Sequence, residues 1–205
     1  MKRLLFLFFL FMASFQMKAQ IAVKFLHFRP TGDQGVAFDK RFTAEIMYMD
    51  EFEKLDGNWR LRAGISYVPL KARLDTFPTY AVEHNGSNVT VLPGYEVYKK
   101  YNMGFLFGGV DWAFVNREKF AFFMGVDILM GGVNMEYERH YENYKDESFS
   151  GGQFMGGVRL RAGGQYMINE HFTGFTEFSR SYYGMAESGF QSHYDYGVGV
   201  IYNFN

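Results

Sequence analysis

The end of the chain constrains its fold more than any other segment. Ser192 to Asn205 reads S-H-Y-D-Y-G-V-G-V-I-Y-N-F-N, and every second residue of it is aromatic or aliphatic: Tyr194, Tyr196, Val198, Val200, Tyr202 and Phe204. Because side chains alternate across a β-strand, these residues share one face, and small or polar residues share the other. Aromatic side chains near both ends, with valine between them, are typical of a strand that crosses a bilayer and meets its two interfaces.

The composition supports a fold made of strands. Of 205 residues, 20% are aromatic and 23 are glycine, while only 4 are proline, which favours strands joined by turns over helices. The formal net charge of −1 argues against nucleic acid as a partner, because phosphate binding needs a concentrated basic face. The absence of cysteine excludes disulfides, thiolate metal sites and a cysteine nucleophile.

Residues 1–19 have the pattern of a signal peptide. Lys2 and Arg3 precede an apolar run from Leu4 to Phe15, and Ala19 supplies a small residue for cleavage. The run is too short to span about 30 Å of hydrocarbon, so we predict a cleaved leader rather than an anchor. No later run suits a membrane helix, and residues 20–205 are predicted to form one exported domain, either soluble or a membrane barrel.

Eight strands are predicted in this domain, with no internal helix. They cover residues 21–29, 36–48, 59–67, 95–115, 120–137, 153–166, 172–179 and 192–205. In the long connection after the third strand, Thr79 to His84 and Val89 to Leu92 flank a turn and predict a hairpin above the barrel rim. The alternation of the fourth and fifth strands is expected to shift at Gly108-Gly109 and Gly131-Gly132, as β-bulges would cause.

The connections between the strands alternate in length. Those after the second, fourth and sixth strands are short, and those after the third and fifth are long. In a membrane barrel with an even number of strands, this alternation predicts short turns and both termini in the periplasm, with the longer loops outside the cell.

Alternation alone does not decide which face points inward, because a soluble barrel has an apolar core and a polar surface. Glycines accompany the charged residues, the apolar rows are too bulky for the inside of eight strands, and both charge signs occur in similar number. These features predict a polar interior with a charge network of Asp39, Arg41, Glu45, Arg60, Arg62, Asp111, Asp127, Arg159, Arg161, Glu177 and Asp195. A paired plug is favoured over an ion path, because unpaired charge in a closed interior is costly.

In these features the chain resembles the small eight-stranded outer-membrane barrels typified by the OmpA transmembrane domain and OmpX. The resemblance covers about Ile21 to Asn205 and is carried by the leader, the alternating connections and the terminal Y-x-Y-x-V-x-V-x-Y-x-F row. It implies an all-β, antiparallel up-and-down transmembrane barrel in the outer membrane. It also implies that the barrel-assembly machinery reads Tyr202 and Phe204 as a terminal signal, although Asn205 follows them.

The sequence offers candidate groups for chemistry but no spacing that requires it. An acyl-transfer site needs a nucleophile, a base and oxyanion donors. The available groups are His140 with Ser148 or Ser150 and Glu142, or His193 with Ser181 and Glu187. The acidic segment from Met135 to Gly152 has no calcium-loop pattern, so a solvated loop is favoured over a cation site. We predict no catalytic, metal or cofactor site.

The function predicted from these features is that of a non-enzymatic outer-membrane barrel, which acts through extracellular loops or as an accessory subunit of a membrane complex. Phe77, Tyr80 and Tyr95 are the candidate contacts for another outer-membrane or surface protein, because exposed aromatic residues are favoured anchors. Membrane lipid and lipopolysaccharide are the expected surroundings. The alternatives are a lipid A-modifying hydrolase or acyltransferase, and a narrow channel for small solutes.

Overall fold

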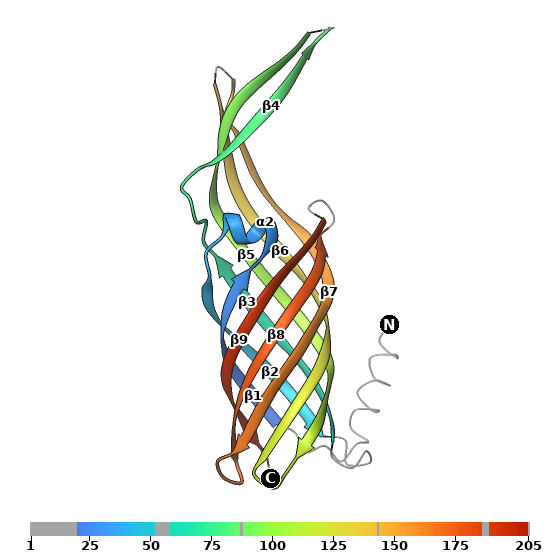
Figure 1. Ribbon diagram of the computed structural model, residues 1–205. Coiled ribbons are helices and arrows are strands. Elements are labelled where there is room, and N and C mark those ends of the chain that lie inside the picture. The colour runs from blue at the N-terminus through green and yellow to red at the C-terminus, as the bar shows by residue number, and fades with distance from the viewer. Residues whose placement is uncertain (1–19, 52–57, 87, 143, 186–188, 205) are drawn as a thin grey trace, which may run out of the picture.

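The computed structural model describes residues 20–51, 58–86, 88–142, 144–185 and 189–204. Within these ranges the chain forms nine strands and one short helix (Figure 1). The elements are β1 (Gln20–Pro30), α2 (Gly32–Ala37), β2 (Arg41–Glu51), β3 (Trp59–Leu70), β4 (Phe77–Asn85), β5 (Asn88–Asn116), β6 (Phe120–Tyr141), β7 (Glu147–Met167), β8 (Phe172–Met185) and β9 (Gly189–Asn203). The predicted leader, residues 1–19, lies outside the described residues.

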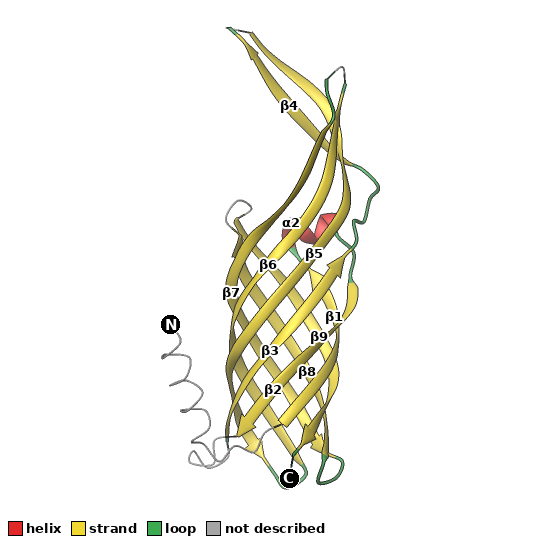
Figure 2. Cartoon of the chain, turned by 180° about the vertical axis from the view of Figure 1, so that it is seen from behind, coloured by secondary structure: helices red, strands yellow, loops and turns green. Residues whose placement is uncertain are grey.

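Eight of the strands close into an antiparallel barrel. The hydrogen-bonded order is β3-β2-β1-β9-β8-β7-β6-β5, and β3 also pairs with β5, which closes the ring. The first and last strands pair along the whole length of β1, and at the lower end Gln20 lies opposite Asn203 (Figure 1). The predicted eight-stranded, antiparallel, all-β barrel is therefore confirmed. The ninth strand, β4, pairs with the part of β5 that extends above the barrel (Figure 2).

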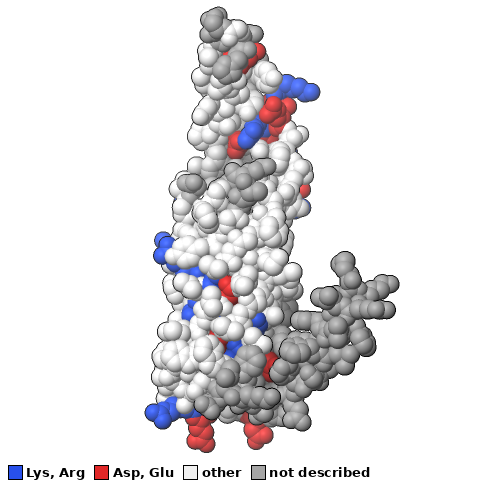
Figure 3. All heavy atoms as spheres, turned by 90° about the vertical axis from the view of Figure 1, so that its right-hand side faces the viewer, with Lys and Arg blue, Asp and Glu red and all other residues white. Residues whose placement is uncertain are grey.

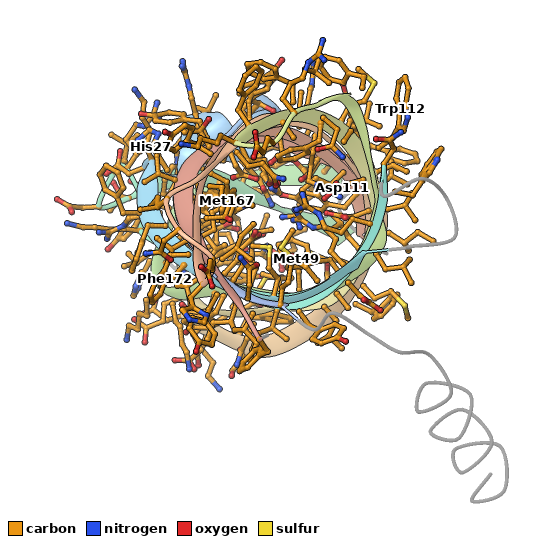
Figure 4. The ribbon with its side chains drawn as sticks, turned by 90° about the horizontal axis from the view of Figure 1, so that it is seen from below. His27, Met49, Asp111, Trp112, Met167 and Phe172 are labelled. Carbon is orange, nitrogen blue, oxygen red and sulfur yellow. The ribbon has the colours of Figure 1, made fainter. Side chains whose placement is uncertain are left out.

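The outer surface of the barrel is apolar and aromatic. Phe25, Ile65, Leu106, Ile128 and Val198, each from a different strand, are all exposed. Viewed from below, Trp112, His27 and Phe172 lie outside the ring, whereas Asp111 and Met49 point into it (Figure 4). Seen from one side, most of the visible wall is uncharged, with patches of Lys, Arg, Asp and Glu atoms across its middle (Figure 3). An apolar exterior around a partly charged interior is the arrangement of a transmembrane barrel.

The expected shifts of alternation at Gly108-Gly109 and Gly131-Gly132 are wrong. The pairing of β5 with β6 runs through both glycine pairs without interruption, and its irregularities lie between Tyr98 and Lys100 and between Ala113 and Val115. The same face points inward throughout, but its character changes along the barrel. The change of pattern at these glycines therefore marks where the inward-facing residues change from charged to apolar, and it does not mark a bulge.

The expectation of no internal helix is also wrong. The second strand begins at Arg41 instead of Val36, and residues 32–37 form α2 across the upper mouth of the barrel (Figure 1). Phe38, expected on the outer row of this strand, is buried and lies against Tyr101, with ring centroids 4.3 Å apart. Burying this aromatic side chain in the mouth removes more apolar surface from water than exposing it on a longer strand.

Candidate functional site

The interior of the barrel holds a continuous network of buried ion pairs. Arg161 lies 2.6 Å from Asp111, 2.8 Å from Asp127 and 3.4 Å from Glu177. Arg159 joins Asp127, at 2.8 Å, to Glu45 on the opposite wall. The network therefore ties together strands that are far apart in the sequence, as a plug would.

Three further cations complete the network from the other side of the barrel. Lys24 lies 2.6 Å from Glu45 and 2.7 Å from Glu177. Arg62 lies 2.7 Å from Glu177, and Arg60 donates a hydrogen bond to Asp111 at 3.2 Å. Sequence reasoning missed Lys24, because apolar residues surround it in β1 and the alternation there is weak. Its position in the row of Ala22, Leu26 and Phe28 was the available signal.

Nine of the predicted interior charges are buried inside the barrel: Glu45, Arg60, Arg62, Asp111, Asp127, Arg159, Arg161, Glu177 and Asp195. The prediction that Asp39 belongs to this interior network is wrong. Asp39 precedes β2, is half exposed and lies 3.5 Å from Arg73 on the rim. Arg41 stands at the first position of β2, is partly buried and forms no ion pair with another described residue. The predicted network therefore begins at Glu45 along this strand.

Glycine makes room for the charged side chains. A Cβ on Gly125 would lie 2.2 Å from the Asp111 Oδ1 and 2.8 Å from the Arg161 Nη2. A Cβ on Gly109 would lie 2.4 Å from the Asp127 Oδ1. These distances are shorter than van der Waals contact, so the network fits only because the neighbouring inward positions carry no side chain.

Above the network the interior is aromatic and aliphatic, and α2 covers it. The buried side chains at these levels are Leu26, Phe28, Val68, Tyr101, Met103, Phe105, Leu129, Val133, Met135, Met155 and Tyr183. Gln34 of α2 donates a hydrogen bond to the Tyr101 hydroxyl at 3.1 Å and accepts one from the Tyr183 hydroxyl at 2.7 Å. The upper end of the barrel is therefore closed by packed and hydrogen-bonded side chains.

The lower end is open as far as the charge network. A cavity of about 520 Å³ there is lined by polar and charged residues that include Asn58, Gln165 and Lys119. Of the network residues in the described part of the chain, Arg60 and Asp111 border this cavity. The lining carries both signs of charge, so it has no evident preference for anions or cations.

The second candidate catalytic group, His193 with Ser181, lies inside the barrel. Ser181 is 0% exposed and stands opposite His193 in the β8–β9 pairing. The His193 Nε2 lies 3.1 Å from Asp195, and the Ser181 Oγ has no hydrogen-bond partner in the described structure. These residues border a cavity of only about 10 Å³, which holds roughly one water molecule and admits no lipid substrate. Glu187, the predicted acid, lies outside the described residues.

The first candidate catalytic group, around His140, lies at the surface. The His140 Nδ1 is 2.9 Å from Asp146 rather than bonded to Glu142, and its ring stacks on Tyr95 with centroids 4.8 Å apart. Ser148 and Ser150 stand opposite Glu138 and Glu136 in the sheet. The described contacts place a carboxylate and an aromatic ring beside this histidine, but no serine nucleophile.

Above the barrel, four strands continue as a sheet that we call the blade, formed by residues 77–85, 88–98, 134–141 and 147–154 (Figure 1). It contains the predicted hairpin, which extends further than expected. Tyr80 and Val82 lie opposite Pro93 and Val91 and share one exposed face with Tyr95. Tyr80 is 70% exposed. Phe77 lies on the other face, against Tyr98 with centroids 5.5 Å apart, so the three predicted contact residues do not form one surface.

Among the described residues, β4 pairs with β5 alone, so no described strand covers its outer edge. The Glu142 N–H donates a hydrogen bond to the Pro93 carbonyl at 3.1 Å, so the backbone of Pro93 points toward β6. Its partner across the hairpin, Tyr80, therefore belongs to a non-hydrogen-bonded pair and directs its own N–H and C=O away from β5. Val82, two residues later, has the same orientation. These backbone groups are available to another strand.

The terminal aromatic residues lie at the lower end of the barrel. Tyr202 is outward facing and packs against Phe172 and Phe204, with ring centroids 5.3 Å and 4.9 Å apart. Phe204 follows the last residue of β9 and also borders the lower cavity. Asn205 lies outside the described residues.

The described residues contain neither a metal-binding cluster nor a membrane-spanning helix. No cluster of His, Asp and Glu side chains within them is placed to hold a metal ion. None of their helices is long and apolar enough to cross a membrane.

The sequence matches no protein-family model and no curated protein. Among solved structures, the chain is similar to Neisserial surface protein A, NspA, over 91% of this chain and 97% of that one, with 13% identity and a TM-score of 0.56. It is also similar to Ail, the attachment invasion locus protein of Yersinia pestis, with 14% identity, a TM-score of 0.49 and coverage of 93% and 100%. The N-terminal β-barrel domain of Pseudomonas aeruginosa OprF has 17% identity, a TM-score of 0.42 and coverage of 92% and 100%. The chain has the fold of the small eight-stranded outer-membrane barrels, the OmpA-like and OmpX-like group that its sequence resembles.

Proposed function

We propose that this protein is a non-enzymatic outer-membrane barrel that docks another protein through its blade. The observation that carries the proposal is the free edge of β4, where the backbone groups of Tyr80 and Val82 point away from the sheet. A free edge beside exposed apolar side chains is a template for an added strand. Main-chain hydrogen bonds would hold the partner, and Tyr80 and Val82 would select its side chains.

The composition of β4 supports this proposal. Exposed edge strands are usually protected by lysine, by bulges or by proline. In β4 the only charged residue is Glu83, and the only proline, Pro78, lies near the strand's start. The opposite free edge of the blade, residues 147–154, reads E-S-F-S-G-G-Q-F and is rich in glycine and serine. The edge of β4 is therefore the better template of the two.

The orientation and remaining partners belong to the same proposal. The lower end, with the short turns and both ends of the barrel sheet, would face the periplasm, and the blade would stand outside the cell. Residues 1–19 would be removed on export, and Tyr202 and Phe204 would be read by the barrel-assembly machinery. The blade partner would be another outer-membrane or surface protein.

The two alternative functions have less support. Lipid A modification needs a serine accessible to lipid, whereas Ser181 is fully buried and His140 is paired with Asp146. A solute channel needs a continuous path, whereas the charge network and the apolar layers fill the barrel above the lower cavity.

A photo-crosslinking residue in place of Tyr80, in intact cells, tests the proposal. We expect an adduct with a second protein. Val82→Pro should abolish it, because proline removes an N–H from the free edge while the bonds between β4 and β5 remain. Val82→Thr keeps this N–H and should preserve the adduct.

Two controls make the result interpretable. A crosslinker in place of the lipid-facing Phe178 should give no such adduct. Ala81→Pro, which removes a hydrogen bond within the hairpin, shows the effect of unfolding it. The proposal fails if position 80 gives no protein adduct in cells, or if Val82→Pro leaves the adduct unchanged.

A further inference from the structure

Three cations form a row on the outer wall of the barrel. Arg29 in β1 lies opposite Tyr194 in β9, and Tyr194 lies opposite Arg180 in β8. Lys40 directly precedes Arg41, the first residue of β2, and Arg41 pairs with Phe28, the neighbour of Arg29. Neighbouring strands are about 4.8 Å apart, so the row spans roughly 15 Å across four strands. Its side chains are outward facing, and both Arg29 and Lys40 are exposed.

Aromatic side chains hold the guanidinium of Arg180 in place. It lies 4.6 Å from the ring centroid of Tyr194 and 4.8 Å from that of Tyr182. A cation between aromatic faces is attracted by both rings. Its Nε has no hydrogen-bond acceptor in the described structure. The group is therefore positioned by its neighbours without being neutralised by them.

No carboxylate balances the row. Within the described part of the chain, none of Arg29, Lys40 and Arg180 forms an ion pair. The nearest acid in sequence, Asp39, lies 3.5 Å from Arg73 instead. This contrasts with the cations inside the barrel and on the blade, where Arg161 and Arg139 each contact a carboxylate.

The row also lies at a definite level of the wall. Below it the outward residues of β1 are His27, Phe25, Val23 and Ile21, and those of β9 are Tyr196, Val198 and Val200. Above it, α2 and the connections begin (Figure 1). Uncompensated cations at the border of an apolar belt lie where lipid phosphates are concentrated.

We propose that Lys40, Arg29 and Arg180 form a binding site for the phosphate groups of membrane lipids at the upper end of the barrel. Arg29 and Arg180 flank Tyr194 and can bind one phosphate from both sides, because a guanidinium matches phosphate geometry. The exposed Phe178 and Tyr196, which pair with each other directly below Arg180 and Tyr194, contact the lipid body. In the proposed orientation, this lipid is the phosphorylated glycolipid of the outer leaflet.

Native mass spectrometry of the barrel, folded in detergent with added lipid A, tests this site. We expect the wild type to retain phosphorylated lipid A and to lose lipid A from which the phosphates have been removed. Each Gln substitution should lower the affinity about fivefold, in keeping with the effect of one cation at an anionic membrane surface. The triple variant Arg29→Gln, Lys40→Gln, Arg180→Gln should lower it about a hundredfold.

A matched triple variant next to the blade, Lys99→Gln, Lys100→Gln, Lys145→Gln, makes the same change in charge and should retain the lipid. Arg29→Lys with Arg180→Lys should keep most of the binding, and different mobility of unboiled and boiled samples confirms that each variant is folded. Equal retention by the two triple variants overturns the site. So does equal retention of dephosphorylated lipid A, or binding of inorganic phosphate in lipid-free micelles as strongly as lipid A.

Discussion

The guanidinium of Arg161 lies 2.8 Å from the carboxylate of Asp127, and neither side chain is exposed to solvent. Arg161 also contacts Asp111 and Glu177, so its removal leaves three buried carboxylates with fewer partners. Breaking a buried ion pair from one side costs about 3–5 kcal/mol. We expect Arg161→Met to lower the free energy of unfolding by about this amount, measured by urea titration of the barrel in detergent.

Arg117 provides the control for this prediction. It is exposed in the turn between β5 and β6. Arg117→Met makes the same change in charge and should alter the free energy of unfolding by no more than about 0.5 kcal/mol. Equal effects of the two substitutions would mean that the buried network contributes nothing specific to stability.

Gly125 gives a second prediction, about the space that the network needs. A methyl group there would meet the Asp111 Oδ1 at 2.2 Å and the Val110 carbonyl oxygen at 2.6 Å. Overpacking of this kind costs about 1–3 kcal/mol, so Gly125→Ala should destabilise the barrel in the same urea titration.

Gly108→Ala is the matched substitution on the outer face. The nearest atom to its Cβ, the Arg62 carbonyl oxygen, is 3.9 Å away, which is ordinary contact. We expect this variant to be as stable as the wild type or more stable by up to about 1 kcal/mol, because alanine restricts the unfolded chain. Equal losses at the two positions would contradict the steric argument.

The alternation of the strands predicted the barrel but not what fills it. Apolar rows in β5 were read as lipid facing, yet Phe105 and Phe107 point inward, because the interior changes from charged to apolar along its length. Alternation identifies two faces within one strand. Whether an inward position meets an arginine or a phenylalanine depends on strands far away in the sequence, such as β3, where Arg62 lies over the Phe107 ring at 5.1 Å.

The charge network was predictable because its residues interrupt otherwise small or apolar rows, as Arg159 and Arg161 do in β7. Its pairing was not, because Lys24 and Glu177 come from strands separated by most of the chain. The helix α2 was missed for a related reason. Its residues have turn-forming character, and the hydrogen bonds of Gln34 to the hydroxyls of Tyr101 and Tyr183 in the mouth join residues far apart in the sequence.

Gln34 leads to a third prediction. Gln34→Leu removes the acceptor of the Tyr183 hydroxyl and the donor to the Tyr101 hydroxyl, and both phenols are buried. An unsatisfied buried polar group costs about 1–3 kcal/mol, so the mouth should open more often. Hydrogen exchange measured by mass spectrometry should become faster over residues 32–38 and remain unchanged over β6 and β7 at the level of Asp127. The exposed Val36 is the control site, and Val36→Leu should leave exchange as in the wild type.

The packing of the interior predicts the electrical behaviour of the barrel. The cavity at the lower end ends at Arg60 and Asp111, and above them charged, then apolar, side chains fill the space that eight strands enclose. We therefore expect the wild type to show no steady current in planar bilayers. Removing one layer, as in Phe105→Ala with Tyr183→Ala, should also give no current, because the ion pairs of Arg159 and Arg161 remain below it. A stable conductance of the wild type would contradict a sealed interior and would favour the solute channel. A current that appears only when both the charge network and the apolar layer above it are disrupted would locate the two barriers where the structure places them.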